Sequence, residues 1–138
     1  MQLLLVRHAI AFDPSAERWP DDAERPLTPQ GMERARKAAR GLKRIAGPPV
    51  RVLASPLTRA QQTAAILTRS AGWPESTPCV ELAPGASPDD TLALLARSRE
   101  PCIALVGHEP GLSRLIAACL PGGGAAAFEM KKMGVALL

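Results

Sequence analysis

Three short apolar runs constrain the fold of this chain more than any other feature. They cover residues 2–6, 50–54 and 102–106, and their apolar residues are mostly Leu, Val, Ile and Ala. Runs of this length, bounded by polar or turn residues, are typical of buried strands. Segments with helical patterning separate the runs. Strands that alternate with helices predict an α/β fold with a largely parallel sheet.

Signals for helix ends divide the rest of the chain. Thr28 followed by Pro29 is typical of a helix start, and apolar residues then recur at three- and four-residue steps to about residue 45. Ser87 and Pro88, followed by two aspartates, form a second clear start. Helices are therefore expected over residues 28–45, 57–71, 88–98 and 110–120. Further short strands are expected at residues 79–82, 126–130 and 134–138.

Size and composition fit one soluble-type globular domain over residues 1–138. A chain of 138 residues can bury its own core without disulfide or metal support. Aromatic residues make up 3% and there is no Tyr, which favours an aliphatic core and disfavours a base-stacking platform for nucleic acid. The net charge of +4 suits an anionic substrate without requiring DNA or RNA. No nucleic-acid partner is expected.

Three cysteines without a C-x-x-C spacing predict reduced, mostly buried thiols and a cytoplasmic location. The N-terminal apolar run stops at Arg7, too early for a signal peptide, and no run reaches the ~20 apolar residues of a membrane span. No membrane partner is expected. The two histidines lack metal-ligand spacing, so neither a metal nor another cofactor is expected.

Polar side chains follow each of the three predicted strands. Arg7 and His8 follow the first strand, Ser55 follows the second and His108 follows the third. Ligands of α/β proteins bind beyond the carboxyl ends of the strands, so these residues are expected at one edge of the sheet. Each alone is as easily a cap, core or surface residue. Both histidines of the chain fall there, however, and this coincidence predicts a functional site.

These residue types favour phosphoryl transfer. Arg7 and Arg59, the latter in the first turn of a predicted helix, carry forked donors that match phosphate oxygens. An imidazole beside two guanidinium groups resists protonation, and neutral His8 is then a nucleophile. His108 can stabilise charge on the phosphoryl oxygens. We therefore expect metal-independent phosphoryl transfer through a phosphohistidine.

Two groups of basic residues are interpreted without a role in the site. The predicted helix at 28–45 carries six basic residues and one acidic residue, which is typical of a solvated helix face with cations near its C-terminus. Lys131 and Lys132 are interpreted as charges of a hairpin or an edge strand.

The motifs resemble those of a known family. Leu-Val-Arg-His-Ala at residues 5–9, the segment 55–64 that begins Ser-Pro-Leu-Thr-Arg, and Val-Gly-His-Glu-Pro-Gly at 106–111 resemble three signatures of the histidine phosphatase (phosphoglycerate mutase-like) superfamily. Residues 25–31 resemble its fourth, weaker signature. The resemblance implies a three-layer α/β/α sandwich, His8 as nucleophile, and a phosphate pocket of Arg7, His8, Arg59 and His108. The short chain and its Arg-Pro-Leu-Thr element look most like SixA-type phosphohistidine phosphatases.

Two positions bear on the resemblance. Ala9 replaces the glycine that usually follows the nucleophile, and its methyl group is tolerable if φ is negative. Glu81, with Gly85 four residues later, matches the spacing of the general acid in mutase-like members. SixA-type members are thought to manage without that acid. Glu81 is therefore either a catalytic acid or a solvated residue at a strand end.

The expected substrate follows from the leaving group. An alkoxide needs a proton from a general acid, whereas imidazole, whose conjugate acid has a pKa of about 6.5, needs far less help. Between His8 and Thr28 lie 19 residues, and no segment looks like a lid. We expect a phosphatase acting on phosphohistidine of a partner protein. The alternatives are a small-molecule phosphomonoesterase of the same superfamily and a catalytically weak phosphate-binding regulatory module.

Overall fold

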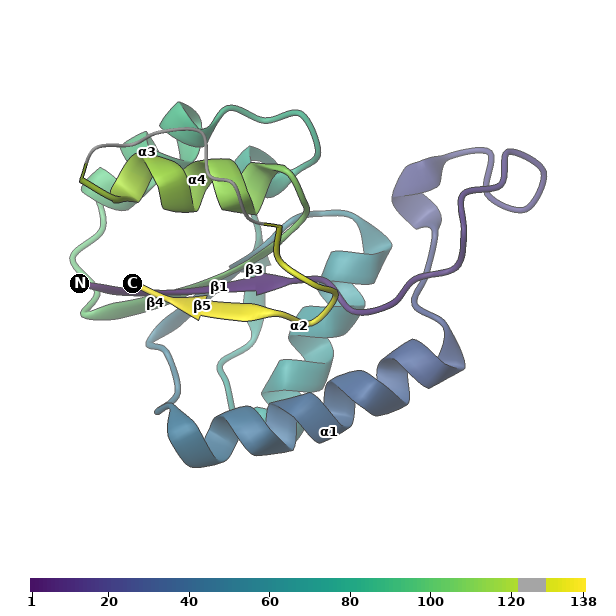
Figure 1. Cartoon of the computed structure of the whole chain (residues 1–138), viewed down its shortest axis with the longest axis horizontal. Coiled ribbons are helices and arrows are strands. Elements are labelled where there is room, and N and C mark those ends of the chain that lie inside the picture. The colour runs from purple at the N-terminus through teal and green to yellow at the C-terminus, as the bar shows by residue number, and fades with distance from the viewer. Residues whose placement is uncertain (122–128) are drawn as a thin grey trace.

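A computed structural model describes residues 1–121 and 129–138, and it confirms the predicted α/β fold. Within these residues, five strands form one sheet in the order β3-β2-β4-β1-β5. The first four strands are parallel, and β5 pairs antiparallel with β1 at the edge of the sheet (Figure 1). The strands are β1 Gln2–Arg7, β2 Arg51–Ala54, β3 Ser76–Pro78, β4 Cys102–Gly107 and β5 Val135–Leu137.

Helices cover both faces of the sheet and complete a three-layer α/β/α sandwich. In Figure 1, α1 (Pro29–Ile45) and α2 (Thr58–Ala71) lie on one side, and α3 (Pro88–Ala96) and α4 (Gly111–Cys119) lie on the other. Successive residues of a strand point to opposite faces, so each central strand feeds two apolar cores. In β1, Leu4 and Val6 join the core under α1 and α2, whereas Leu3 and Leu5 join the core under α3 and α4. This is the three-layer architecture that the sequence predicts.

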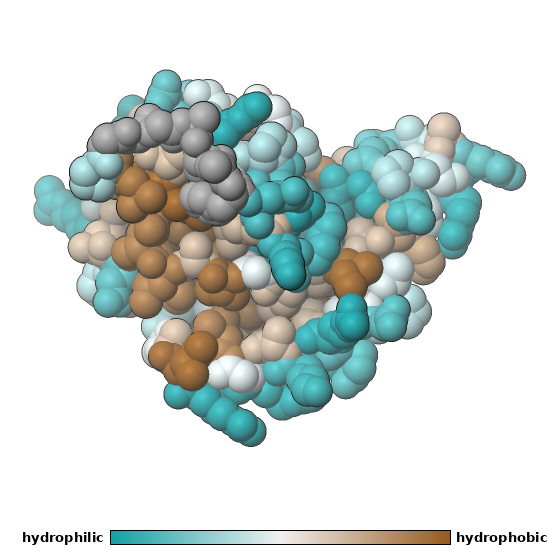
Figure 2. Space-filling model, in the orientation of Figure 1, coloured by the Kyte–Doolittle hydropathy of each residue, from teal (hydrophilic) through white to brown (hydrophobic). Residues whose placement is uncertain are grey.

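Helix α1 begins where the sequence predicts. The hydroxyl of Thr28 accepts a hydrogen bond from the Gly31 amide, and Pro29 occupies the first turn. A Cβ on Gly31 would lie 2.1 Å from the Ile10 carbonyl oxygen, so glycine lets α1 approach the chain beyond β1. The six basic residues of α1 are exposed, which agrees with a solvated face, and Figure 2 shows hydrophilic residues along this helix.

The strand predicted at residues 79–82 is wrong. The Cys79 amide donates to the Ala54 carbonyl oxygen and extends the sheet ladder by one residue beyond β3. The Ala83 amide then donates to the Val80 carbonyl oxygen, which closes the 3₁₀ helix η2 (Val80–Leu82). The turn buries Cys79 and Leu82 and leaves Val80 exposed. A short, mostly apolar run of this length therefore suits a 3₁₀ turn as well as a strand.

The C-terminal predictions are partly confirmed. Strand β5 lies inside the predicted segment 134–138. Of the strand predicted at 126–130, residues 126–128 lie outside the described residues, and residues 129 and 130 are not in a strand. The three cysteines are free, but only Cys79 is buried, so the expectation of mostly buried thiols is wrong. Within residues 1–121 and 129–138, no helix combines the length and apolar character that a membrane crossing requires.

Candidate active site

The carboxyl ends of three neighbouring strands bring both histidines together. Strand β4 lies between β1 and β2, and the register aligns Arg7 with Gly107. The His8 amide donates to the Gly107 carbonyl oxygen at 3.0 Å, and the Ser55 amide donates to the Val106 carbonyl oxygen at 2.9 Å. The residues that follow these strands therefore lie at one edge of the sheet, as expected from the sequence.

The two imidazole rings lie close together, tilted against each other, in a buried position. Their centroids are 5.0 Å apart, with 54° between the ring planes, and His8 and His108 are 4% and 6% exposed. The Nδ1 atom of His8 lies 2.7 Å from the Ala9 carbonyl oxygen, which can only accept a hydrogen bond. His8 Nδ1 therefore carries the proton and Nε2 carries the free lone pair. His108 Nε2 is 2.8 Å from Ser55 Oγ.

Burial keeps both rings neutral at neutral pH. It is the main cause that lowers the pKa of His8 to about 3, and the nearby charge of Lys132 is the second. Burial also lowers the pKa of His108 to about 3, with the charge of Arg59 as the next cause. Like charge was the cause expected from the sequence, but loss of solvation is the larger one. His8 Nε2 is thus available as a nucleophile.

Two guanidinium groups present unused donors at the same edge. Arg59 donates to the carbonyl and carboxylate oxygens of Asp22 at 2.9 and 3.1 Å, and Arg7 donates to Glu129 Oε1 at 2.8 Å and to the Met130 carbonyl oxygen. The Nε–H groups of both arginines are buried and have no hydrogen-bond partner among the described residues. A buried donor without an acceptor is costly, so both groups are candidate donors to an anion.

Thr63 links the first two sequence motifs. Its hydroxyl accepts a hydrogen bond from the Ala9 amide at 3.0 Å and donates to the Arg59 carbonyl oxygen at 2.7 Å. It thereby fixes the start of α2 against the chain that follows His8. Among the described residues, Met133 is the one non-glycine residue with a positive φ, so Ala9 avoids the backbone conformation that would penalise its methyl group.

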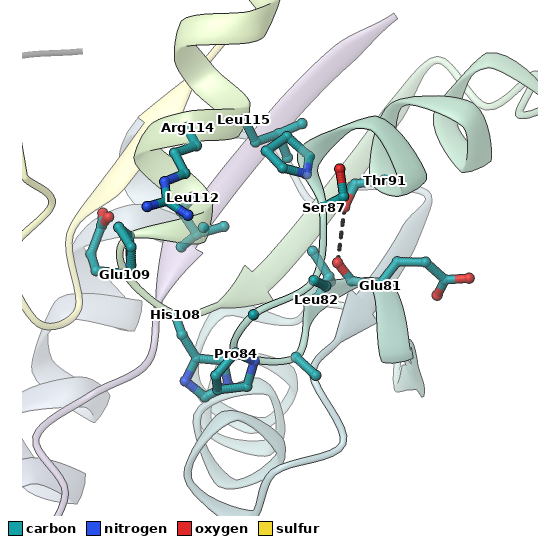
Figure 3. A pocket seen from close by; sticks show the side chains of 16 residues that line it. Glu81, Leu82, Pro84, Ser87, Thr91, His108, Glu109, Leu112, Arg114 and Leu115 are labelled. Carbon is teal, nitrogen blue, oxygen red and sulfur yellow. Dashed lines mark hydrogen bonds between the residues drawn. The ribbon is translucent and has the colours of Figure 1, made fainter. Parts of the chain in front are cut away.

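Glu81 is not brought to the nucleophile. It lines a pocket beside His108, formed by residues 81–88 and the start of α4, but Figure 3 shows its carboxylate pointing away from His108. Glu81 Oε2 accepts a hydrogen bond from the Cys79 thiol at 3.2 Å. Hydrogen bonds from its own backbone N–H and from Cys79 lower the pKa of Glu81. Both the direction of the carboxylate and its lowered pKa disfavour a catalytic acid.

Lys132 and Asp22 also belong to the site, and the sequence interpretation missed both. Lys132 Nζ lies 3.3 Å from His8 Nε2, and Asp22 binds Arg59 from the 3₁₀ helix η1 (Asp22–Glu24). The segment between His8 and Thr28, where no lid was expected, thus contacts Arg59. Only the pairing of β5 with β1 could have revealed Lys132, since it sets the preceding turn beside His8.

No group of three or more His, Cys, Asp or Glu side chains that could hold a metal ion occurs in residues 1–121 and 129–138. The donors around His8 are guanidinium, ammonium and imidazole groups. Such cations and donors bind oxyanions directly, so the chemistry they can perform on their own is binding and transfer of a phosphoryl group.

Comparison with known proteins assigns the family. A sequence model of the histidine phosphatase superfamily (branch 1) matches residues 3–82. An uncharacterized protein of Picosynechococcus sp. is 34% identical over 138 residues, covering 98% of this chain and 82% of that protein. The chain belongs to the histidine phosphatase superfamily.

Solved structures agree with this assignment and indicate a SixA-like member. A structure of the protein histidine phosphatase SixA in complex with tungstate has a TM-score of 0.85 and 27% identity, covering 99% of this chain and 86% of that chain. A putative alpha-ribazole-5'-P phosphatase from Escherichia coli has a TM-score of 0.76 and 21% identity, covering 99% of this chain and 89% of that chain, and it shows the shared fold.

Proposed function

We propose that this protein is a phosphatase that carries the phosphoryl group on His8 Nε2 and removes it from phosphohistidine on a partner protein. The observation that carries the proposal is a buried, unprotonated Nε2 at the sheet edge that also holds two guanidinium groups, whose Nε–H donors have no partner among the described residues. Family membership supports the phosphatase chemistry. The location that fits such a role is the cytoplasm, as expected from the free cysteines.

The reaction takes place in two steps. In the first, the Nε2 lone pair of His8 attacks phosphorus, the N–P bond forms, and the bond to the leaving group breaks with its electron pair staying on the leaving group. In the second, water attacks phosphorus and loses a proton, the bond to His8 breaks, and inorganic phosphate leaves. Arg7, Arg59 and His108 bind the oxygens and stabilise the transition state in both steps. Neither step requires a metal ion.

The missing acid favours phosphohistidine as substrate. The carboxylate of Glu81 points away from His108, so it is not placed to protonate a leaving alkoxide (Figure 3). A departing imidazole is a weak enough base to leave with little help from an acid. The SixA structure with 27% identity, described as a protein histidine phosphatase, supports the same substrate class.

A small-molecule phosphomonoesterase is the second candidate, because a pocket adjoins His108. Pro84, Leu112 and Leu115 form part of its wall, and this apolar surface offers a place for a small leaving group (Figure 3). The related fold of a putative alpha-ribazole-5'-P phosphatase supports this reading. A phosphate-binding regulatory module with weak catalysis is the third candidate, and it would accumulate phosphorylated His8 without turnover.

One experiment separates the three candidates. Phosphate release is measured from a protein phosphorylated on histidine, from p-nitrophenyl phosphate and from glycerol phosphate, with wild-type protein and His8→Gln. We expect release from phosphohistidine, weak release from p-nitrophenyl phosphate, whose leaving group needs no acid, and none from glycerol phosphate. Rapid quenching into alkali, where the N–P bond survives, should reveal the phosphoryl group on His8 by mass spectrometry.

The outcomes are distinct. Full activity in folded His8→Gln would exclude the proposed mechanism. Efficient release from glycerol phosphate would transfer the protein to the phosphomonoesterases. A phosphorylated His8 that persists for hours would support the regulatory module.

A further inference from the structure

The turn that precedes β5 is fixed against the end of β1. The Met133 amide donates to the carbonyl oxygens of Arg7 and His8 at 3.2 and 3.3 Å, and the Arg7 amide donates to the Gly134 carbonyl oxygen at 3.1 Å. On the other side of the turn, the Met130 amide donates to Glu109 Oε1 at 3.1 Å. The turn is thus anchored both to the strand that carries the nucleophile and to the segment that follows His108.

The backbone of this turn is strained. Met133 has a φ of 61°, in the left-handed region that side chains rarely adopt, and such conformations persist only where the surroundings enforce them. A Cβ on Gly134 would lie 2.8 Å from the Lys131 carbonyl oxygen, so the turn closes only with glycine there. Strain of this kind is concentrated at functional sites. In this turn the strain accompanies the side-chain contact of Lys132 with His8.

Lys132 contacts the atom that the reaction uses. Its Nζ lies 3.3 Å from His8 Nε2, although Lys132 as a whole is exposed. His8 Nδ1 carries the ring proton and donates it to the Ala9 carbonyl oxygen, so the ammonium group donates to the Nε2 lone pair. Before substrate binds, the ammonium therefore occupies the space next to the nucleophile into which the phosphoryl group must move.

We propose that Lys132 is a phosphoryl-binding residue: its ammonium group leaves His8 Nε2 as the substrate enters and binds a non-bridging oxygen of the transferred group. This inference rests on the proposed function of the same site. In-line attack places the leaving group on the far side of phosphorus from Nε2. A cation that touches Nε2 in the free protein therefore lies on the side of the oxygens, away from the leaving group.

The surrounding charges support this role. The pKa of Lys132 is lowered to about 8, first by burial and then by the charges of Arg7, Arg25 and Arg59, while Glu129 opposes the shift. In the free protein the ammonium group thus lies among cations and against a neutral imidazole. A phosphoryl dianion would supply the missing counter-charge, because opposite charges at short range favour both charged forms.

Kinetics and oxyanion binding test the role of Lys132. Lys132→Ala and Lys132→Met, which keeps an unbranched side chain without the charge, are compared with Lys131→Ala. Lys131 is exposed. Its substitution by alanine does not remove the hydrogen bond that the Gly134 amide donates to the backbone carbonyl oxygen of residue 131. We expect kcat/KM for phosphohistidine and the affinity for tungstate to fall about 10- to 100-fold in both Lys132 variants, as for loss of one charge-assisted hydrogen bond. Lys131→Ala should stay within about twofold of wild type.

A readout without turnover complements the kinetics. Lysine side chains are reductively methylated with carbon-13, which retains the charge, and the four lysines are followed by NMR during a tungstate titration. The Lys132 signal should shift and its pKa should rise on binding, while the other three lysines stay unchanged. Unchanged Lys132 signals in protein that binds tungstate would overturn the inference, as would Lys132 variants that match Lys131→Ala.

The proposed function can fail separately. Wild-type protein that releases phosphate while its Lys132 variants remain unimpaired contradicts only the role of Lys132. Folded wild-type protein that neither releases phosphate nor binds tungstate contradicts the proposed function, and the inference fails with it.

Discussion

Two parts of the molecule bring cations to His8, and they do so by different means. Arg7 and Arg59 come from the end of β1 and the first turn of α2, within the parallel framework of the fold. Lys132 comes from the turn before β5, where the chain returns antiparallel to the edge of the sheet. The arginines belong to motifs near the strand ends, whereas Lys132 reaches the site through long-range pairing.

The two parts also differ in how firmly they hold their charges. The Nη atoms of Arg59 are fixed by Asp22, which leaves the buried Nε–H free for a ligand. Lys132 makes one contact with the site and is otherwise exposed. Preorganised donors are the larger source of transition-state stabilisation, because they need no rearrangement during the reaction. The arginines should therefore contribute more to catalysis than Lys132.

Among the cations around His8, the largest effect is expected for Arg59. Arg59→Ala should lower kcat/KM about 10²- to 10³-fold, the usual loss when one preorganised donor is removed from a transition-state site. Arg59→Lys should recover only a small part of the lost kcat/KM. A lysine ammonium group cannot bind Asp22 and present a second, fixed donor at the same time, as the guanidinium group does. Steady-state kinetics with phosphohistidine protein measures both. Arg69→Ala, an exposed change on the same helix, serves as control. A loss below about tenfold would put the arginine and lysine contributions on the same level.

A pH titration of sulfate binding separates the two kinds of cation. Sulfate keeps its double negative charge from pH 6 to 10, and the arginines stay charged throughout. The groups that influence Lys132 are His8, Arg7, Arg25, Arg59 and Glu129. With a pKa of about 8, free Lys132 is charged below that pH, so its contribution is present at pH 6–7 and is lost as pH rises above 8.

We expect the sulfate affinity of wild-type protein to fall about tenfold between pH 8 and pH 10, measured by calorimetry. The affinity of Lys132→Met should be lower at pH 7 and should change little over the same range. A parallel decline in both proteins would mean that the titrating group is not Lys132.

Gly134→Ala tests whether the strained turn positions Lys132. The added methyl group would lie 2.8 Å from a backbone oxygen of Lys131, so the turn must shift, at about 1–3 kcal/mol. We expect a lower Tm and a roughly 3- to 10-fold fall in kcat/KM. In a Lys132→Ala background the same change should cost stability without a further loss of activity. Gly41→Ala is the control, because nothing described lies within 4 Å of its Cβ.

The fold and the positions of both histidines were predictable because their signals are local. Buried strands that are each followed by a polar residue predicted where His8 and His108 lie. Thr28 with Pro29 predicted the start of α1. The sequence did not predict the contact of Lys132 with His8, since this contact depends on the pairing of β5 with β1. That pairing joins Leu5 and Ala136, which are 131 positions apart in the sequence. The local sequence around Lys132 favoured an ordinary edge charge.

The same limit applies to Glu81, where spacing suggested a role that geometry does not support. Motif spacing specifies which residues follow one another but not the direction of a side chain. The 3₁₀ helix η2 replaces the predicted strand at this point, and its Glu81 accepts a hydrogen bond from Cys79 instead of facing the imidazoles. A residue at a turn needs the three-dimensional structure before its role can be assigned.

The smallest effect is therefore expected for Glu81→Gln. It should change kcat/KM for phosphohistidine by less than about threefold, because the carboxylate points away from His108 and its lowered pKa leaves it deprotonated. Glu75→Gln, a change at an exposed glutamate, is the control. If Glu81→Gln instead abolished release from glycerol phosphate while sparing p-nitrophenyl phosphate, the segment would have to rearrange on binding to bring the acid to the leaving group. The cations at His8 would then act together with a movable acid, and the protein would be a phosphomonoesterase.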